Sequence, residues 1–178
     1  MVPTLETERL LLRPLAEGDL DEYAVMMADP AVVEFLGTPP MDRADAWRHL
    51  ALLLGHGVLR GWTSNAVVEK ATGRLLGRCG LWQPEGWPGL EVGWTFARSS
   101  WGQGYATEAA AAWRDWAFTE VEADQLISVV HRDNVRSARV AERIGHRRLR
   151  EIAVRGFPCI LYGQPYPERI ATSAPSAT

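Results

Sequence analysis

The segment LEVGWTFARSSWGQGYATEAAAAWRDWAFTE, residues 90–120, decides the fold. Apolar and other residues alternate through residues 90–96, which is the two-residue period of a strand with one apolar face. Residues 99–104 then supply small side chains and two glycines, so the backbone can turn tightly. From Tyr105 onward, alanine and tryptophan recur at helical spacing, while Glu108 and Arg114 fall outside that apolar stripe. The segment therefore predicts a strand, a glycine loop and an amphipathic helix in succession.

The start of the predicted helix has the features of an anion-binding site. The N–H groups of its first turn have no acceptor within the helix, and the helix dipole is positive there. Gly102 and Gly104 would let the backbone come close to phosphate oxygens. The alternative is a simple strand-to-helix turn. GQGYAT lacks the last glycine of the dinucleotide fingerprint, and no GK[ST] follows as a P-loop requires.

Length and composition indicate one ordinary globular domain. The chain has 178 residues, 47% of them hydrophobic and 23% charged. We expect a single domain over residues 1–169 and a disordered tail of small residues over 170–178. The net charge of −3 offers no bulk attraction to nucleic acid or to an anionic membrane. No apolar stretch approaches the roughly 20 residues of a membrane span, and the N-terminus lacks a signal peptide pattern, so we expect a cytoplasmic protein.

Metal and disulfide chemistry are not predicted. Cys79 and Cys159 lie in strand-like surroundings and are expected to be buried free thiols. The four histidines show no ligand spacing, so we expect no metal site.

The order of predicted elements is that of an α+β fold. Expected strands cover residues 10–12, 62–69, 75–82, 90–96, 125–130, 147–154 and 158–162, which makes about seven. Expected helices cover residues 20–27, 31–36, 42–54 and 105–120, and a further helix begins at Asp133 or Asn134 and ends at Gly145. The third helix is expected to end at Gly55, with Trp47 and Leu50 on its apolar face.

Three stretches occur in a familiar order and spacing: ETERLLLRPL at 6–15, EVGWTFARSSWGQGYATEA at 91–109 and DNVRSARVAERIGHRR at 133–148. Together they resemble the GNAT superfamily of N-acetyltransferases, and in particular its ribosomal-protein N-terminal acetyltransferase branch of RimJ and RimL type. The resemblance implies a GNAT fold, in which a central mixed, mostly antiparallel sheet is splayed in the middle and flanked by helices. It also implies acetyl-CoA as the acyl-donor co-substrate.

The resemblance assigns cofactor contacts residue by residue. The backbone of Trp94, Thr95 and Phe96 would pair with the pantetheine arm where two strands splay apart. The pyrophosphate would be held by Gly102, Gln103, Gly104, Tyr105, Ala106 and Thr107. Asn134 matches an asparagine that contacts the cofactor, and Ser137 matches a serine near its sulfur.

The sequence departs from the family pattern in two important places. Ser99 stands where relatives often have Gln or Arg, which removes one polar contact in the loop. Ala141 stands where many relatives have a tyrosine that serves as general acid, so a tyrosine acid at that position is excluded. The aromatic residue usual after the closing glycine of that helix is His146 here.

Acetyl transfer to an amine needs a group that takes a proton from the ammonium and a group that stabilises the thiolate. Glu91, on the strand face opposite the apolar row, is the first candidate for the base, and Glu151 is a weaker one. A solvated or salt-bridged glutamate is the alternative for Glu91. Ser137 would donate a hydrogen bond to sulfur, or would merely cap its helix.

Further residues invite two interpretations each. Arg147, Arg148 and Arg150 would either meet the 3′-phosphate of CoA or carry solvated strand charge, and the second interpretation is favoured. The tryptophans next to glycine or proline turns are expected to line a substrate mouth: Trp82, Trp87 and Trp101.

The expected function is transfer of an acetyl group from acetyl-CoA to a primary amine by direct attack, without a covalent enzyme intermediate. The acceptor would be a protein N-terminal α-amine or a small-molecule amine, and a homodimer is possible in this branch. The alternative is a non-catalytic acyl-CoA-binding sensor module.

Overall fold

The computed structural model describes residues 1–165, so the predicted tail over 170–178 lies outside the described residues. The helices are α1 (Leu20–Ala28), α2 (Pro30–Val33), α3 (Arg43–Arg60), α4 (Tyr105–Glu120) and α5 (Val135–Arg143), with short 3₁₀ turns at Glu17–Asp19 and Arg98–Ser100. The strands are β1 (Leu5–Glu6), β2 (Leu10–Arg13), β3 (Ser64–Glu69), β4 (Leu75–Trp82), β5 (Glu91–Phe96), β6 (Gln125–His131), β7 (Arg147–Val154) and β8 (Phe157–Pro165).

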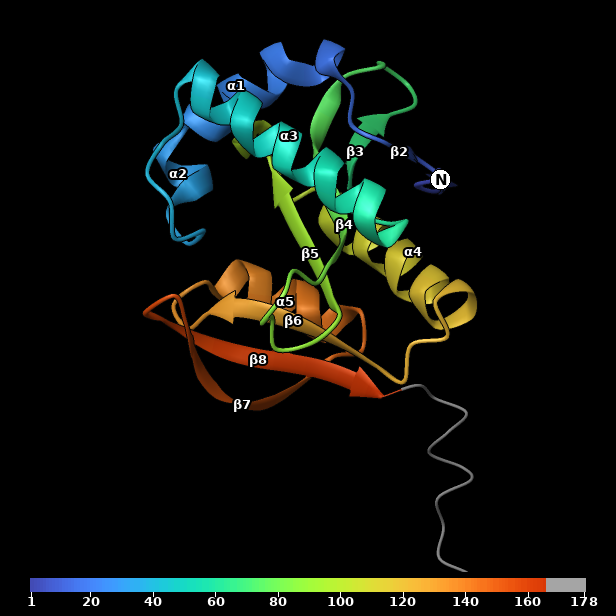
Figure 1. The fold of residues 1–178 in the computed structure, drawn as a ribbon, viewed down its shortest axis with the longest axis vertical. Helices are drawn as coiled ribbons and strands as arrows, with labels where there is room; N and C mark the ends of the chain where they lie inside the picture. Colours follow the sequence, from blue (N-terminus) through green and yellow to red (C-terminus); the bar gives the residue numbers. More distant parts are fainter. Residues whose placement is uncertain (166–178) are drawn as a thin grey trace, which may run out of the picture.

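The strands form one sheet in the order β1-β2-β3-β4-β5-β6-β8-β7 (Figure 1). Every neighbouring pair is antiparallel except β5 and β6, which run parallel. The predicted α+β fold with a mixed, mostly antiparallel sheet is therefore confirmed. The prediction of about seven strands was one too few, because the two-residue strand β1 carries too short a pattern to be recognised.

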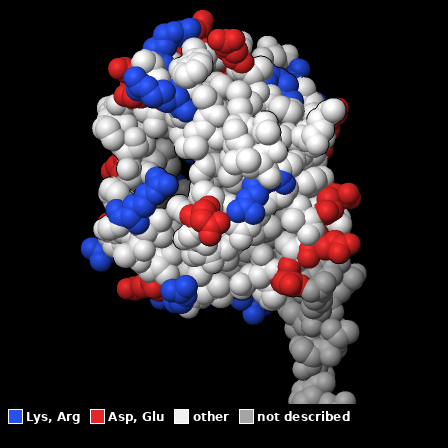
Figure 2. All heavy atoms as spheres, viewed as in Figure 1, with Lys and Arg blue, Asp and Glu red and all other residues white. Residues whose placement is uncertain are grey.

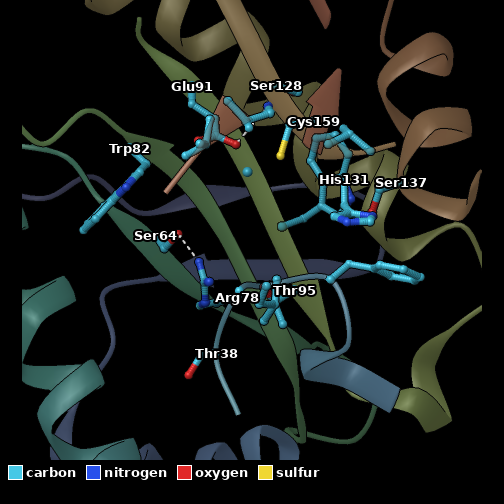
Figure 3. Close-up of a pocket in the computed structure, with 18 of the residues that line it drawn as sticks. Thr38, Ser64, Arg78, Trp82, Glu91, Thr95, Ser128, His131, Ser137 and Cys159 are labelled. Carbon is cyan, nitrogen blue, oxygen red and sulfur yellow. Dashed lines mark hydrogen bonds between the residues drawn. The ribbon is translucent and has the colours of Figure 1, made fainter. Parts of the chain in front are cut away.

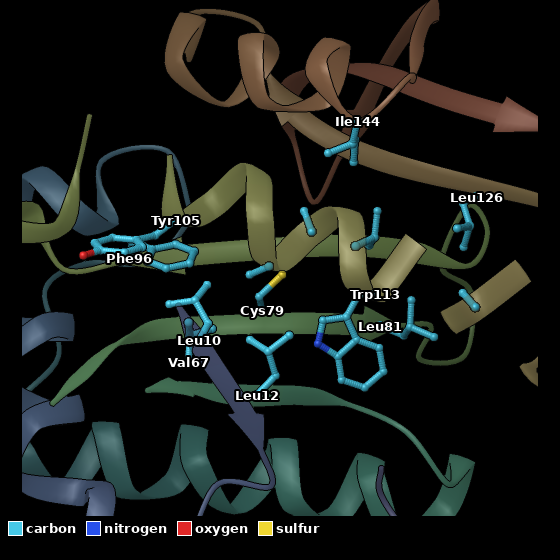
Figure 4. Packing of buried hydrophobic residues seen from close by; sticks show 14 of the residues in the cluster. Leu10, Leu12, Val67, Cys79, Leu81, Phe96, Tyr105, Trp113, Leu126 and Ile144 are labelled. Carbon is cyan, nitrogen blue, oxygen red and sulfur yellow. The ribbon is translucent and has the colours of Figure 1, made fainter. Parts of the chain in front are cut away.

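The sheet has a hydrophobic cluster on each face, and β3 contributes to both because its side chains alternate. Val67 points to the α4 side, where Trp113 of α4 lies in the same cluster as Leu12 and Leu81 (Figure 4). Ala66 and Val68 belong to the other cluster, with residues of α1 and α3. The sheet is therefore covered by α4 on one face and by α1 and α3 on the other.

The third predicted helix was placed correctly at its start but not at its end. Asp42 accepts a hydrogen bond from the backbone N–H of Asp45, as an N-cap should, but α3 continues past Gly55 to Arg60. It ends at Gly61, which has a φ of 80° and is the residue in the left-handed region. The predicted position of Trp47 on the buried face was also wrong, because its side chain is 49% exposed.

Candidate active site

The site begins where β5 and β6 separate. The two strands are in register only at Glu91 and Ile127, where the Ile127 N–H donates to the Leu90 carbonyl at 2.9 Å. Beyond that point side chains bridge the strands. The Ser128 hydroxyl donates to the Val92 carbonyl at 2.8 Å, and the Val129 N–H donates to the Glu91 carboxylate at 3.1 Å. The sheet is thus splayed in the middle, and beyond these bridges that edge of β5 is not paired with β6. At its end the Phe96 carbonyl accepts a hydrogen bond from the Trp101 indole N–H at 2.9 Å.

The glycine loop leads from β5 into the N-terminus of α4. Gly102 and Gly104 have φ values of 77° and 84°, a region that an L side chain rarely adopts, and Gly104 is the N-cap of α4. Within residues 1–165, the N–H groups of residues 102–107 have no hydrogen-bond acceptor. The loop therefore presents a row of free donors at the positive end of a helix, which is the arrangement that a diphosphate requires.

The loop is held from behind by Arg9 of the first motif. Its guanidinium donates to the Gln103 carbonyl at 3.0 Å and to the Glu108 carboxylate at 2.7 Å. It also lies 4.5 Å from the centre of the Tyr105 ring, and the Tyr105 hydroxyl donates to Glu69. Tyr105 is buried, and these contacts of its side chain support the loop.

A pocket of about 430 Å³ lies in front of this loop. All the predicted cofactor contacts except Gln103 line it, namely Trp94, Thr95, Phe96, Gly102, Gly104, Tyr105, Ala106, Thr107, Asn134 and Ser137. The side-chain amide of Gln103 donates instead to the Ser99 carbonyl at 3.0 Å. The residues that the second and third motifs predict thus meet at one place, although they come from β5, the glycine loop, α4 and α5.

The basic residues of this pocket come from α5 and were missed as candidates for the site. Arg136, Arg139 and Arg143 line the pocket, and the Arg136 guanidinium lies 3.9 Å from the centre of the Trp101 ring. Their spacing of three and four residues places them on one helix face, a signal that the sequence already contained. The cluster of Arg147, Arg148 and Arg150 on β7 is exposed and lines neither pocket described here, which favours solvated strand charge.

A second pocket, of about 360 Å³, adjoins the first (Figure 3). Trp94, Thr95, Asn134 and Ser137 line both pockets, so the two meet along β5 and the start of α5. Glu91 lies in the second pocket together with Trp82 and Trp87, two of the tryptophans expected at a substrate mouth, while Trp101 lines the first pocket.

Glu91 is neither solvated nor paired with a cation within residues 1–165; its side chain is buried. The Trp87 indole N–H donates to one carboxylate oxygen at 2.7 Å, and the Val129 N–H donates to the other at 3.1 Å. Burial raises the pKa of Glu91 to about 7, although the two donors and the charge of Arg78 oppose that shift. The carboxyl group can therefore gain and lose a proton near neutral pH.

The start of α5 has the expected cap. The Asn134 side chain accepts a hydrogen bond from the Ser137 N–H at 3.1 Å, so Asn134 is the N-cap and the Ser137 hydroxyl is left facing the pockets. Glu151 is exposed and pairs with Arg148 at 2.8 Å on β7, away from both pockets.

Of the two departures from the family pattern, Ser99 is exposed and Ala141 is buried, and His146 beyond α5 is buried as well. Ala141 is fully buried against Val130 and Tyr162. The ring nitrogen Nδ1 of His146 lies 3.2 Å from the Ser128 hydroxyl, and burial lowers the pKa of His146 to about 4. Since the single Ser128 hydroxyl hydrogen goes to Val92, Nδ1 of His146 must donate to the Ser128 oxygen.

Other chemistry is not evident in the described part of the chain. Cys79 and Cys159 are buried free cysteines, as predicted. Residues 1–165 contain no group of three or more His, Cys, Asp or Glu that could hold a metal ion. No helix in this range is long and apolar enough to cross a membrane.

Comparison with known proteins agrees with this geometry. The family model described as an acetyltransferase (GNAT) domain matches residues 9–147, so the chain belongs to the GNAT family. It is therefore an acetyl-CoA-dependent acyltransferase.

Three relatives illustrate the similarity. The uncharacterized protein YkkB of Bacillus subtilis is 32% identical, over 89% of this chain and 93% of its own length. The crystal structure of an acetyltransferase from Agrobacterium tumefaciens is 37% identical, with a TM-score of 0.82 over 92% of this chain and 95% of that one. The ribosomal-protein-S5-alanine acetyltransferase of Vibrio fischeri is 18% identical and shares the fold, with a TM-score of 0.73 over 93% of this chain and 98% of that one.

Proposed function

We propose that this acyltransferase moves the acetyl group of acetyl-CoA to a primary amine by direct attack, with Glu91 as the general base. The observation that carries the proposal is the junction of the two pockets: free backbone donors line one pocket, and a buried carboxyl group faces the other. The donor would enter from the α4 side and the amine from the β4 side, and the two would meet beside β5.

The first pocket supports the assignment of the cofactor contacts. The free N–H groups of residues 102–107 would bind the diphosphate, and the open edge of β5 at Trp94, Thr95 and Phe96 would pair with the pantetheine amides. Arg136, Arg139 and Arg143 would face the other phosphate of CoA. The Asn134 amide group would donate to the pantetheine arm, because its oxygen is already used in capping α5.

Glu91 supports the proton transfer. The ammonium of the acceptor loses a proton to the Glu91 carboxylate, directly or through one water, and the free amine attacks the thioester carbon. The carbon–sulfur bond then breaks, the nitrogen of the adduct gives up its extra proton, and the CoA thiolate takes up one proton through solvent. The Ser137 hydroxyl would stabilise that thiolate by donating a hydrogen bond, since a serine is too weak an acid to protonate it fully.

The wider predictions rest on the motif resemblance. The resemblance to the RimJ and RimL branch, together with the fold shared with the Vibrio fischeri enzyme, supports a protein N-terminal α-amine as one class of acceptor. A small-molecule amine is the other class. A cytoplasmic location and a homodimer stay predictions.

The test is thiol release from acetyl-CoA over a panel of amines, with mass spectrometry of the product. Glu91→Gln should lower kcat/KM by about 10²-fold or more, because the base is lost while the side-chain volume is kept. Glu151→Gln is the matched control and should leave the rate unchanged. CoA binding without turnover on any amine would contradict the proposal and would favour a sensor.

A further inference from the structure

The second pocket contains a cation that forms no ion pair within residues 1–165, although its charge acts on Glu91 from a distance. Arg78 of β4 lines this pocket, and its guanidinium donates to the Ser64 hydroxyl at 3.0 Å. Its Nε is buried and has no hydrogen-bond partner, and within residues 1–165 Arg78 forms no ion pair. A partly buried guanidinium without a carboxylate is costly, unless a ligand completes it.

A second unused donor lies directly opposite. Thr95 of β5 is the register partner of Arg78, and its hydroxyl is also buried and has no hydrogen-bond partner within residues 1–165. In Figure 3, Arg78, Ser64 and Thr95 lie together on one side of the pocket and Glu91 lies on the other. The three side chains form a set of donors that face the pocket, which we name the Arg78 subsite.

The charges that line the second pocket also favour an anionic ligand. Arg78 and Arg155 both line the pocket, whereas Glu91 is the only carboxylate among its lining residues within 1–165. His49 also lines the pocket, but burial together with the charge of Arg78 lowers its pKa to about 3, so it is uncharged. The pocket thus offers one acceptor of an ammonium proton and an excess of positive charge.

The distance between the Arg78 guanidinium and the Glu91 carboxyl group limits the size of the ligand. Trp82 is the register partner of Glu91 and lies four residues from Arg78 on β4. The Cα atoms of Arg78 and Glu91 are therefore about 13 Å apart along the strands. Both side chains shorten that gap. Met27, Trp82 and Phe157 also line the pocket and give it apolar surface.

We propose that the acceptor is a small amine that carries its own anionic group, a carboxylate or a phosphate, with the anion bound in the Arg78 subsite and the amine at Glu91. This inference rests on the proposed function and adds the class of acceptor. An arginine fork binds such oxygens in a bidentate manner, and Thr95 supplies a further hydrogen bond. Polycationic amines are disfavoured, because a second ammonium would lie among arginines rather than carboxylates.

The experiment compares matched amines that differ only in the anion. Glycine, β-alanine, 4-aminobutanoate, 6-aminohexanoate and phenylalanine are each tested beside their carboxamides, and 2-aminoethyl phosphate beside ethanolamine. Spermidine represents polycations, and trialanine amide represents peptide N-termini that carry no carboxylate. We expect one spacing to be best, with kcat/KM about 10- to 100-fold above that of its uncharged counterpart. The phosphate pair identifies which anion is preferred.

Variants test the role of the subsite. Arg78→Met should bring the kcat/KM of the acid close to that of its carboxamide, so that their ratio is near one. Arg78→Lys should restore part of the ratio. Using the ratio removes any effect of Arg78 on Glu91. Arg74→Met is the matched control, since Arg74 is exposed and lines neither pocket. Thr95→Val removes only the hydroxyl and should lower the ratio even if Arg78→Met folds poorly.

Calorimetric titration of each amine into CoA-saturated protein separates this inference from the proposed function. Preferential binding of the acids without any acetylated product would leave the Arg78 subsite supported and would refute the proposed function. Equal binding and equal turnover of acids and carboxamides would overturn the subsite alone. Faster turnover of trialanine amide or spermidine than of every anionic amine would overturn it as well.

Discussion

Glu91 accepts two hydrogen bonds and is nevertheless close to half-protonated at neutral pH, because burial outweighs the donors. A carboxylate that bridges splayed strands replaces a backbone carbonyl as the acceptor for the Val129 N–H. The same residue therefore holds the strands at a fixed spacing and supplies the titrating group.

The titration of Glu91 makes stability depend on pH. Its pKa is raised from 4.5 in the reference state to about 7 in the folded state, so the folded protein holds a proton that the unfolded chain has lost between those values. The free energy of unfolding should fall by about 3 kcal/mol as pH rises through that window. The loss is complete only above pH 7, where Glu91 is ionised in the folded protein as well. Urea unfolding from pH 4 to pH 8.5 measures this loss. Glu91→Gln should flatten the profile, and an unchanged slope in that variant would refute the assignment.

Ser128 connects β6 to β5 and to His146, and we expect Ser128→Ala to lower the free energy of unfolding by about 1–3 kcal/mol. The substitution removes the donor of the Val92 carbonyl and the acceptor of the His146 ring N–H, both of which lie in the interior. Ser137→Ala is the control, because that hydroxyl faces the pockets and should cost less than about 0.5 kcal/mol. Chemical denaturation measures the free energy of unfolding of both variants, and equal values would contradict the role of Ser128.

At the scale of elements, the N-terminus of α4 depends on backbone conformations that only glycine adopts freely. Gly102→Ala should weaken CoA binding about tenfold or more, because an alanine at a φ of 77° shifts the loop and its free N–H groups. Gly73→Ala is the matched control: Gly73 has a φ of 71°, equally open surroundings and a place in the turn between β3 and β4. Both variants should lose similar stability, and only Gly102→Ala should lose affinity in calorimetry. Equal CoA affinities would contradict the assignment of the loop.

Elements with a strong local period were predictable, and elements set by long-range contacts were not. The helix over residues 105–120 and the strand over 75–82 were placed to the residue, since their periods are regular and turn residues flank them. The prediction that Gly55 ends the third helix was wrong because a glycine on the open face of a helix costs too little to end it. A Cβ added at Gly55 would meet no other part of residues 1–165 within 4 Å.

The cofactor side of the site was predictable because motifs encode it, whereas the acceptor side was not. Trp94, Gly102 and Asn134 belong to motifs that can be recognised in sequence. Arg78 and Ser128 carry no local signal, and they become informative only when β4, β5 and β6 are placed side by side. Whether the charge of Arg78 has a partner depends on which strands lie beside it in the fold, and no single segment of the sequence shows this.

At the scale of the whole molecule, the sheet consists of two parts that join only weakly. Strands β1 to β5 form one part and β6, β8 and β7 the other. Within residues 1–165 the only backbone register pair between them joins Glu91 of β5 to Ile127 of β6 (Figure 1). On the face shown in Figure 2, positive and negative side chains are interspersed, so this face carries no large field of one sign. The first pocket has walls from both parts, because β5 and the α4 N-terminus face Asn134 and Arg139 of α5.

CoA should therefore act as a bridge between the two parts. At a ligand concentration of about 100 times Kd, the stability gain is about 2.7 kcal/mol. Hydrogen exchange should slow at the α4 N-terminus and, beyond the direct contacts, throughout β6 and α5, because their local opening now breaks ligand contacts. Pantetheine lacks the diphosphate, so it should protect the splayed strands without protecting the first turn of α4. If CoA raised the melting temperature while leaving exchange in β6 and α5 unchanged, the ligand would be bound by the first part alone, and the proposed contacts of Asn134 and the α5 arginines would have to be given up.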